Sequence, residues 1–304
     1  MGRYGKSATQ SRRCCVLKVP VLLLLMLTMI AGCSDRSSPS SSAASPNCIR
    51  YQDAGIDRLV WGPDGGLLVA VTRNPNDFEA IVRVLDARLK ELESWPTSVI
   101  DATQITVGAQ SLVYWIDPTG AVRSRGIGVV EAVRALVPGG NLAFPSWTTR
   151  GLIGLRLLPG DRPGAPGEVV LFDMAGDGTV ASVYTPSHLV GSLVASETGD
   201  VMAVHELDPP EIRPRASLLI VIRKLADPIV LPMEPSVELV SLGSDGSSAL
   251  AIDSSTGFLL RINLADGRTE VLRHNTSAAV ESTGGVLAWG EGRTGGEGTL
   301  CSDD

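Results

Sequence analysis

The stretch Pro63-Asp64-Gly65-Gly66-Leu67-Leu68-Val69-Ala70-Val71 joins a tight-turn sequence to a short apolar run. Glycine after Pro-Asp supplies the positive φ that such turns need, and a short Leu/Val run after a turn is typical of a buried β-strand. The same arrangement recurs five times: residues 108–111 before LVYWI, 149–151 before LIGL, 198–200 before VMAV, 244–248 before ALAI and 283–285 before VLAW. The sequence therefore predicts an all-β protein built from repeats.

The spacing of these repeats predicts the architecture. The apolar runs begin at residues 67, 112, 152, 201, 249 and 286, so they are 45, 40, 49, 48 and 37 residues apart. A four-stranded propeller blade takes about 40 to 45 residues. A second strand pair follows within some repeats, for example at 168–173 and 179–184. We therefore predict a β-propeller of six four-stranded blades over residues 48–304, with short helices or turns only at 86–94 and 130–136.

One of the turns also carries a family resemblance. Trp61-Gly62-Pro63-Asp64-Gly65 resembles the Trp/Phe-Ser-Pro-Asp-Gly turn of WD40-like propellers of the periplasmic TolB type, with Gly62 in place of serine. Leu242-Gly243-Ser244-Asp245-Gly246 is a weaker copy, and the other repeats keep only the position of the turn. The Gly-His and Trp-Asp dipeptides of true WD40 repeats do not appear. The resemblance covers roughly residues 50–300 and implies the fold, but it assigns no functional residue to this chain.

The two ends of the repeat region suggest how the ring closes. The sixth repeat has an inner strand pair and a third strand near residues 298–302, while Cys48-Ile49-Arg50-Tyr51 reads as a strand with no blade of its own. Pairing of these N- and C-terminal strands would complete the sixth blade and place Cys48 beside Cys301. We therefore predict a disulfide between them, since both would lie in an oxidising compartment. The alternative is two unpaired thiols on frayed ends.

Residues 1–32 have the parts of an export signal. Five basic residues and no acid precede the apolar run at 21–30, which is too short to span a bilayer. The tetrapeptide Ile30-Ala31-Gly32-Cys33 resembles the lipoprotein box of bacteria at all four positions. That resemblance implies removal of residues 1–32 and attachment of a lipid to Cys33. The alternative is an ordinary secretory signal that is cut nearby, with Cys33 incidental.

The segment after this box predicts a tether and a location. Residues 33–47 include SSPSSSAAS, the Ser/Pro/Ala composition of a solvated linker. Attachment through Cys33 would hold the domain at the cell membrane or the outer membrane, on the periplasmic or extracellular side. Ser34 follows Cys33 where an aspartate would favour the inner membrane, so the resemblance implies the outer membrane if the cell has one.

The charge balance bears on the partners. The chain has 26 Lys+Arg and 33 Asp+Glu, and all five charged residues of positions 1–32 are basic, so the remainder carries a net charge of about −12. An acidic surface repels the phosphate backbone. We therefore expect no nucleic acid as a partner, and an envelope protein or peptide is the partner class that the composition favours.

No pattern in the sequence predicts catalytic, cofactor-binding or metal-ligating residues. No Cys/His cluster has metal spacing and no G-x-S-x-G elbow occurs. The histidines stand alone in their segments: His188, His205 and His274. Residues 205–208 (HELD) follow a predicted strand and could line a polar site. Three aspartates lack the spacing of a calcium loop and are expected in hairpin turns: Asp173, Asp177 and Asp253.

Four tryptophans lie at the ends of predicted inner strands, where packing in the core is expected and stacking on a ligand is the alternative: Trp61, Trp115, Trp147 and Trp289. Proline-rich loops at 158–167 and 207–214 fall at equivalent places in successive repeats, so we expect them on one rim of the ring.

The sequence leaves three hypotheses about function open. The leading one is a non-enzymatic scaffold that binds an envelope protein or peptide through one face of the propeller, and the other two are its alternatives. The second is a small-molecule or glycan binder that uses the central tunnel, which would require aromatic and acidic side chains to converge there. The third is a hydrolase or lyase of propeller type.

Overall fold

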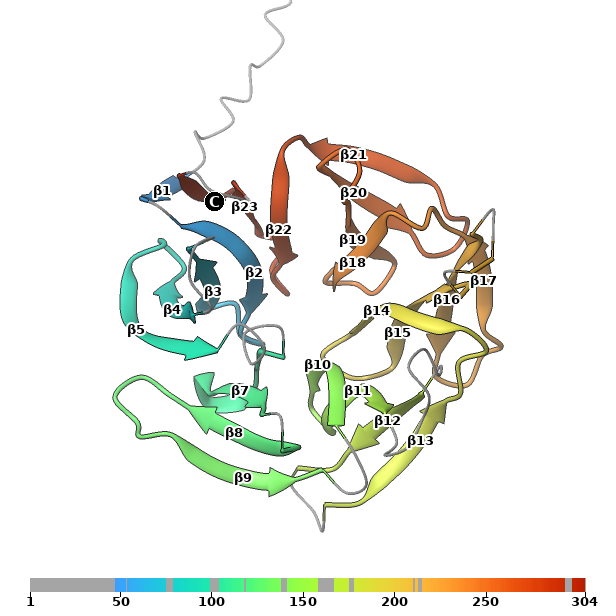
Figure 1. The fold of residues 1–304 in the computed structure, drawn as a ribbon, viewed down its shortest axis with the longest axis horizontal. Coiled ribbons are helices and arrows are strands. Elements are labelled where there is room, and N and C mark those ends of the chain that lie inside the picture. The colour runs from blue at the N-terminus through green and yellow to red at the C-terminus, as the bar shows by residue number, and fades with distance from the viewer. Residues whose placement is uncertain are drawn as a thin grey trace, which may run out of the picture. The chain divides into compact units, whose positions relative to one another are not determined.

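The computed structural model describes residues 47–52, 54–74, 79–98, 104–117, 119–137, 141–157, 167–174, 178–209, 211–212, 215–292 and 297–303. These residues form six four-stranded antiparallel sheets and one turn of 3₁₀-helix, η1 (Ala109–Ser111). Figure 1 shows the sheets following one another around a central axis in chain order. The prediction of a six-bladed, all-β propeller is confirmed.

Each blade uses four strands, the first nearest the axis and the fourth on the outside (Figure 1). Blade 1 is β2 (Gly55–Trp61), β3 (Leu67–Arg73), β4 (Glu79–Asp86) and β5 (Glu91–Ser98); blade 2 is β6 (Thr106–Val107), β7 (Val113–Ile116), β8 (Ala121–Arg125) and β9 (Ala132–Leu136); blade 3 is β10 (Asn141–Thr148), β11 (Gly151–Leu157), β12 (Glu168–Phe172) and β13 (Val180–Tyr184). Blade 4 is β14 (Leu189–Ala195), β15 (Val201–Leu207), β16 (Ser217–Arg223) and β17 (Ile229–Pro232); blade 5 is β18 (Val237–Leu242), β19 (Ser248–Asp253), β20 (Phe258–Asn263) and β21 (Thr269–Arg273); blade 6 is β22 (Thr276–Glu281), β23 (Leu287–Glu291), β24 (Gly298–Ser302) and β1 (Asn47–Tyr51).

The hydrophobic core lies between the blades. Each of the six clusters of buried apolar side chains joins two neighbouring blades. In β3, for example, Leu68 and Ala70 face blade 6, whereas Val69 and Val71 face blade 2. Both faces of a blade are therefore buried. For this reason the second strand of each repeat reads as a continuous apolar run rather than an alternating one.

The ring closes through blade 6, as predicted. The N-terminal strand β1 pairs with the C-terminal strand β24, which completes the sheet β22-β23-β24-β1. Cys48 stands directly opposite Cys301 in this register, and the two form a disulfide. The first and last strands of the described domain are thus joined by both a hydrogen-bond ladder and a covalent bond.

The predicted repeat positions agree closely with the structure, but the two segments predicted as short helices or turns contain no helix and are mostly strand. The second strand of every blade begins within one residue of the predicted start. Residues 86–90 form a turn and β5 follows it, while most of the other segment is β9. Both are outermost strands that pair with a third strand, so sheet pairing overrode the helix-forming residues of these segments.

Arginine side chains clasp neighbouring blades on the outside of the ring. The guanidinium of Arg125 on β8 lies 4.5 Å from the ring centre of Trp95 on β5, and it pairs with Glu93 at 2.8 Å. Arg83 on β4 lies over Tyr51 on β1 in the same way, and Arg273 on β21 lies over Trp289 on β23. Within the described residues, three of the six blade junctions therefore carry a cation–π contact.

Several sequence-based expectations fall outside the described residues. They concern Cys33 with residues 1–46, Asp177, nearly all of the loop at 158–167, and part of the loop at 207–214. In the part of the chain that is described, no helix is long and apolar enough to cross a bilayer.

Candidate functional site

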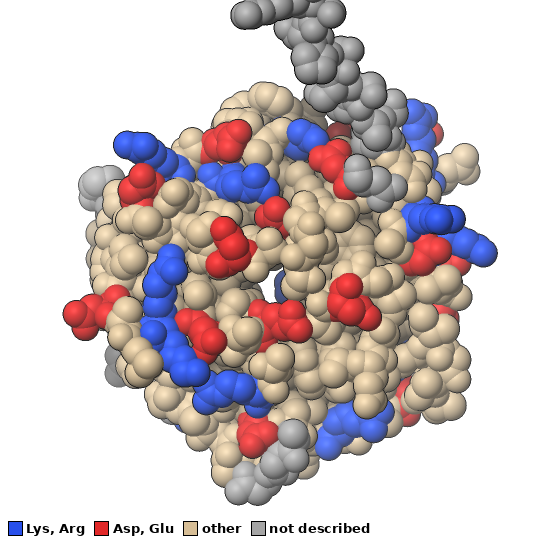
Figure 2. All heavy atoms as spheres, turned by 180° about the vertical axis from the view of Figure 1, so that it is seen from behind, with Lys and Arg blue, Asp and Glu red and all other residues tan. Residues whose placement is uncertain are grey.

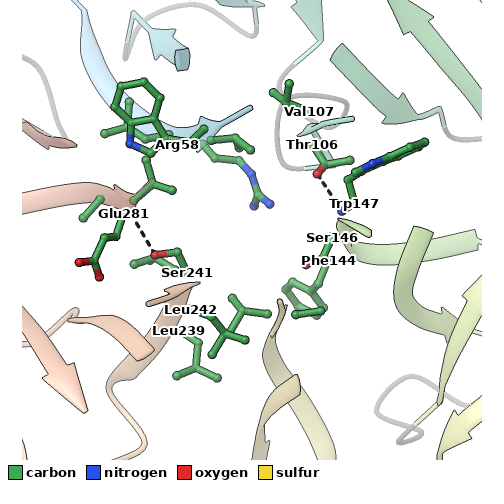
Figure 3. A pocket seen from close by; sticks show the side chains of 18 of the residues that line it. Arg58, Thr106, Val107, Phe144, Ser146, Trp147, Leu239, Ser241, Leu242 and Glu281 are labelled. Carbon is green, nitrogen blue, oxygen red and sulfur yellow. Dashed lines mark hydrogen bonds between the residues drawn. The ribbon is translucent and has the colours of Figure 1, made fainter. Parts of the chain in front are cut away.

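A cavity of about 750 Å³ lies on the axis of the ring. The first strands of all six blades, with the turns that follow several of them, supply its walls (Figure 3). We call this space the central cavity. Its polar and aromatic lining among the described residues includes Asp57, Arg58, Trp61, Gln104, Thr106, Phe144, Ser146, Trp147, Ser192, Glu238, Ser241, Ser277 and Glu281.

Irregular pairing of the first strands determines which side chains reach the cavity. The register between the first and second strands shifts in five blades: at Ile56/Arg58, Ala143/Ser146, Val190/Ser192, Leu239/Ser241 and Thr276/Ala278. A bulge of this kind re-aims side chains and is common beside binding sites. Regular alternation would send these residues into the cores between the blades. The bulges make it possible for polar residues in otherwise apolar strands to face the axis.

Hydroxyl groups on the first strands tie the blades together around the cavity. The backbone N–H of Leu239 on β18 donates to Ser192 Oγ on β14 at 2.9 Å, and Ser277 Oγ on β22 donates to the carbonyl of Ile56 on β2 at 2.8 Å. Thr106 on β6 accepts from the N–H of Trp147 on β10 at 3.1 Å. These bonds hold the inner wall in place, so the cavity does not depend on a ligand for its shape.

Arg58 places a positive charge inside the ring. Its side chain extends from β2 and its guanidinium points into the open centre of the cavity (Figure 3). Burial lowers the pKa of this group, and the negative charge of Glu238 partly offsets that effect. An arginine remains protonated in proteins. The Nε of Arg58 is buried and has no hydrogen-bond partner among the described residues.

Aromatic side chains form part of the wall. Phe144 on β10 has a φ of 53°, an uncommon backbone conformation for a residue with a side chain, and its ring lies at the cavity (Figure 3). Trp147 stacks on Tyr114, with ring centres 4.8 Å apart. A Cβ at Gly108 would lie 2.6 Å from atoms of both rings, so only glycine fits beneath this pair. Trp61 is the remaining aromatic residue of the described lining, and its buried Nε1 has no hydrogen-bond partner among the described residues.

Acidic residues surround the opening. Figure 2 shows carboxylates gathered about the central hollow on one face of the ring. The acidic residues in the cavity lining are Asp57, Glu197, Glu238, Asp245 and Glu281. Two of them pair with arginine: Asp57 with Arg73 at 2.7 Å and Glu281 with Arg261 at 3.0 Å. The negative charge of this lining disfavours ligands with many negative charges.

The histidines lie elsewhere, and the predicted polar lining at residues 205–208 is not at the cavity. Instead, Glu206 is buried and accepts hydrogen bonds from Tyr184 Oη at 2.6 Å and from the backbone N–H of His188 at 3.2 Å. The His188 ring lies 3.1 Å from the same carboxylate. His274 packs edge-on against Phe258. Glu206 therefore fastens the segment between β13 and β14 to β15.

Two other groups of residues were expected to be structural. Asp253 accepts hydrogen bonds from Ser255 and Thr256 in the turn after β19, and these bonds outweigh the effect of desolvation and lower its pKa to about 2. Trp61, Trp115 and Trp289 are buried in the cores between blades, as expected, and Trp147 packs against the core between blades 2 and 3. Trp61 and Trp147 also belong to the cavity lining. In the described residues, no group of three His, Cys, Asp or Glu side chains could hold a metal ion.

Arg58 supplies a positive charge in the cavity and Phe144 supplies an aromatic ring in its wall, and neither residue was predicted from the sequence. Each nevertheless stands in an unusual sequence context. Arg58 belongs to an Asp-Arg pair inside an otherwise apolar strand, and Phe144 precedes Pro145 within a strand. Proline inside a strand indicates an edge strand. In a propeller blade the first strand is an edge strand, and its unpaired edge faces the axis.

Comparisons with known proteins support the fold and nothing finer. No protein-family model matches the sequence, and no relative is found among curated proteins. Among solved structures, the oligogalacturonate lyase from Vibrio parahaemolyticus is similar, with a TM-score of 0.52 and 9% sequence identity. The alignment covers 85% of this chain and 97% of that chain. At this identity the likeness shows a shared propeller fold alone.

Proposed function

We propose that this protein is a lipid-anchored binding protein of the cell envelope, and that its ligand enters the central cavity. The observation that carries the proposal is the convergence of Arg58 and Phe144 on one space of about 750 Å³, whose lining also includes Glu238. Cavities of small-molecule sites measure about 300 to 1,000 Å³ and combine apolar walls with a few placed polar groups. Among the three sequence-based hypotheses, this geometry favours a binder that uses the tunnel.

The lining supports binding rather than catalysis. Among the described residues around the cavity there is no histidine or cysteine, so proton transfer would fall to carboxylates. Two of these carboxylates, Asp57 and Glu281, are held in ion pairs with arginine. A lyase or hydrolase activity remains the alternative. It has no support from the similar solved structure, because 9% identity carries only the fold.

The anchor rests on the sequence of residues 30–33 and on the linker that follows. We expect the protein produced in bacteria to label with a palmitate analogue and to partition into the detergent phase. Cys33→Ser should abolish both, while Ser34→Ala should keep both. A Cys33→Ser protein that still labels would rule out lipidation at this residue.

The binding proposal is tested with the full-length protein extracted from membranes in mild detergent. Small molecules released by denaturation are identified by mass spectrometry and compared with those from a cavity-filling variant, Ser146→Trp. Ser94→Trp is the matched control, because Ser94 is exposed on the outermost strand β5. We expect at least one compound in wild type and Ser94→Trp that is missing from Ser146→Trp. An identical set from all three proteins would refute a ligand in the cavity, provided that Ser146→Trp melts like the wild type.

A further inference from the structure

We infer that the central cavity selects a ligand with a single carboxylate group, which binds Arg58. This inference rests on the proposed function and names the class of its ligand. The body of such a ligand would be apolar or aromatic, since Phe144, Leu239 and Leu242 lie around the space into which the guanidinium points (Figure 3).

Arg58 is the cation that is placed to bind an anion there. The basic residues among the described lining are Arg58 and Arg73. Arg73 is held by Asp57, with Nε 2.7 Å from Oδ2. The guanidinium of Arg58 instead extends to the middle of the cavity (Figure 3). A planar guanidinium matches the two oxygens of a carboxylate and binds them with parallel hydrogen bonds.

Two buried hydrogen-bond donors without partners also support this inference. Arg58 Nε and Trp61 Nε1 are both buried and lack a hydrogen-bond partner among the described residues. Both belong to β2 and to the cavity lining. Because buried N–H groups in folded proteins are normally paired, an acceptor supplied by a ligand would satisfy these two groups. Both groups only donate, so the missing partner is an acceptor.

The surrounding charges limit the ligand to one carboxylate. Glu238 acts on Arg58 electrostatically, and further carboxylates belong to the lining at Glu197 and Asp245. A second anionic group on the ligand would meet these carboxylates, whereas one group is compensated by Arg58. The cavity therefore discriminates against dianions and polyanions by repulsion.

Two sources supply this chemistry: a free organic acid and the C-terminus of a peptide. The probes are N-acetylphenylalanine and the peptide acetyl-Ala-Ala-Phe, each compared with its own C-terminal amide. Binding to the full-length protein in detergent is measured by isothermal titration calorimetry. We expect at least one acid to bind at least tenfold more tightly than its amide. Preference for the single amino acid indicates a free organic acid, and preference for the tripeptide indicates a peptide C-terminus.

Variants assign the effect to Arg58. Arg58→Gln should remove the preference for acid over amide, and Arg58→Lys should keep part of it because the charge remains. Arg268→Gln is the control, since the Arg268 side chain is 88% exposed and pairs only with Asp266 of its own turn in the described structure. All three proteins are first checked for unchanged melting temperature.

The outcomes separate this inference from the proposed function. Equal binding of acid and amide, a preference that survives Arg58→Gln, or no binding of either acid at millimolar concentration would overturn the carboxylate inference. The proposed function would still stand if the membrane-extracted protein released a compound that Ser146→Trp does not retain.

Discussion

Cys48 stands directly opposite Cys301, and their Cα atoms are 4.1 Å apart across the pairing of β1 with β24. The two residues are 253 positions apart in the sequence. Their bond therefore encloses nearly the whole of the ring, and the blade that contains it is the only one in the described structure built from both ends of the chain.

The first prediction concerns this disulfide. In the chain-entropy account, a cross-link over about 250 residues stabilises the folded state by about 5 kcal/mol. Replacing Cys48 and Cys301 together by alanine should lower the melting temperature without changing the far-ultraviolet circular dichroism. Reduction of the wild type should produce the same shift and should leave the double variant unaffected. Equal melting temperatures for oxidised and reduced wild type would contradict the prediction.

The second prediction concerns close packing between blades 6 and 1. A Cβ at Gly290 on β23 would lie 2.6 Å from Cβ and Cγ2 of Ile56. Both atoms are near the backbone and have little room to move, so Gly290→Ala should cost about 1 to 3 kcal/mol of unfolding free energy. Gly284→Ala is the control, because its nearest neighbour is a serine hydroxyl at 3.6 Å. Denaturant unfolding measures both, and similar values for the two would show that the junction relaxes.

The third prediction concerns the outer clasp between blades 1 and 2. Arg125 lies over Trp95 and pairs with Glu93, and Glu93 also accepts from the N–H of Gly128 at 2.6 Å. Arg125→Ala removes the cation–π contact and the ion pair together, so we expect a loss of about 1 to 2 kcal/mol. Arg268→Ala should change the unfolding free energy by less than about 0.5 kcal/mol. A loss for Arg125→Ala no larger than this would show that the clasp adds nothing to stability.

The fourth prediction concerns pH. Desolvation, with a smaller contribution from Arg215, lowers the pKa of the buried His205 to about 4, against 6.5 for the unfolded state. The unfolded chain therefore takes up a proton that the folded chain refuses. The stability from this group is complete above pH 6.5 and is lost as the pH falls toward 4, by up to about 3 kcal/mol.

Urea unfolding at pH 7, 5.5 and 4 should show this decline in the wild type and a flatter dependence in His205→Leu. Asp117 and Asp253 have pKa values of about 2, so the stability that their ionised carboxylates provide is lost mainly below pH 4. That loss is the same in wild type and His205→Leu and does not affect the comparison between them. Parallel curves for the two proteins would contradict the role of His205.

The fold was predictable because its strongest signal is local and repeated. The turn at Pro63-Asp64-Gly65 and its counterparts set the start of each second strand, and burial between two blades makes those strands continuously apolar. The closure of the ring was predictable from an unpaired strand at one end and a missing strand at the other. The outermost strands β5 and β9 were missed, since pairing on one side and exposure on the other leave them a weak pattern.

The cavity was less predictable because it depends on register. Arg58 and Phe144 reach the axis through shifts in pairing between strands, and a one-residue slip moves a side chain to the other face. The identity of such residues is visible in a sequence, but their direction is not. The placement of the loops at 158–167 and 207–214 on one rim of the ring remains a prediction, because nearly all of the first loop and part of the second lie outside the described residues.

The pairing of β1 with β24 in blade 6 also has a consequence for folding. Blades 1 to 5 consist of consecutive strands, whereas blade 6 is complete only when β24, the last strand in the described chain, pairs with β1, the first. Until then β1 is without its partner, and the first and fifth blades each present an apolar face that blade 6 will cover. Such an intermediate is open to strand exchange with a second copy. Formation of the Cys48–Cys301 bond ends that period, because an intramolecular cross-link between these two strands excludes the exchanged pairing.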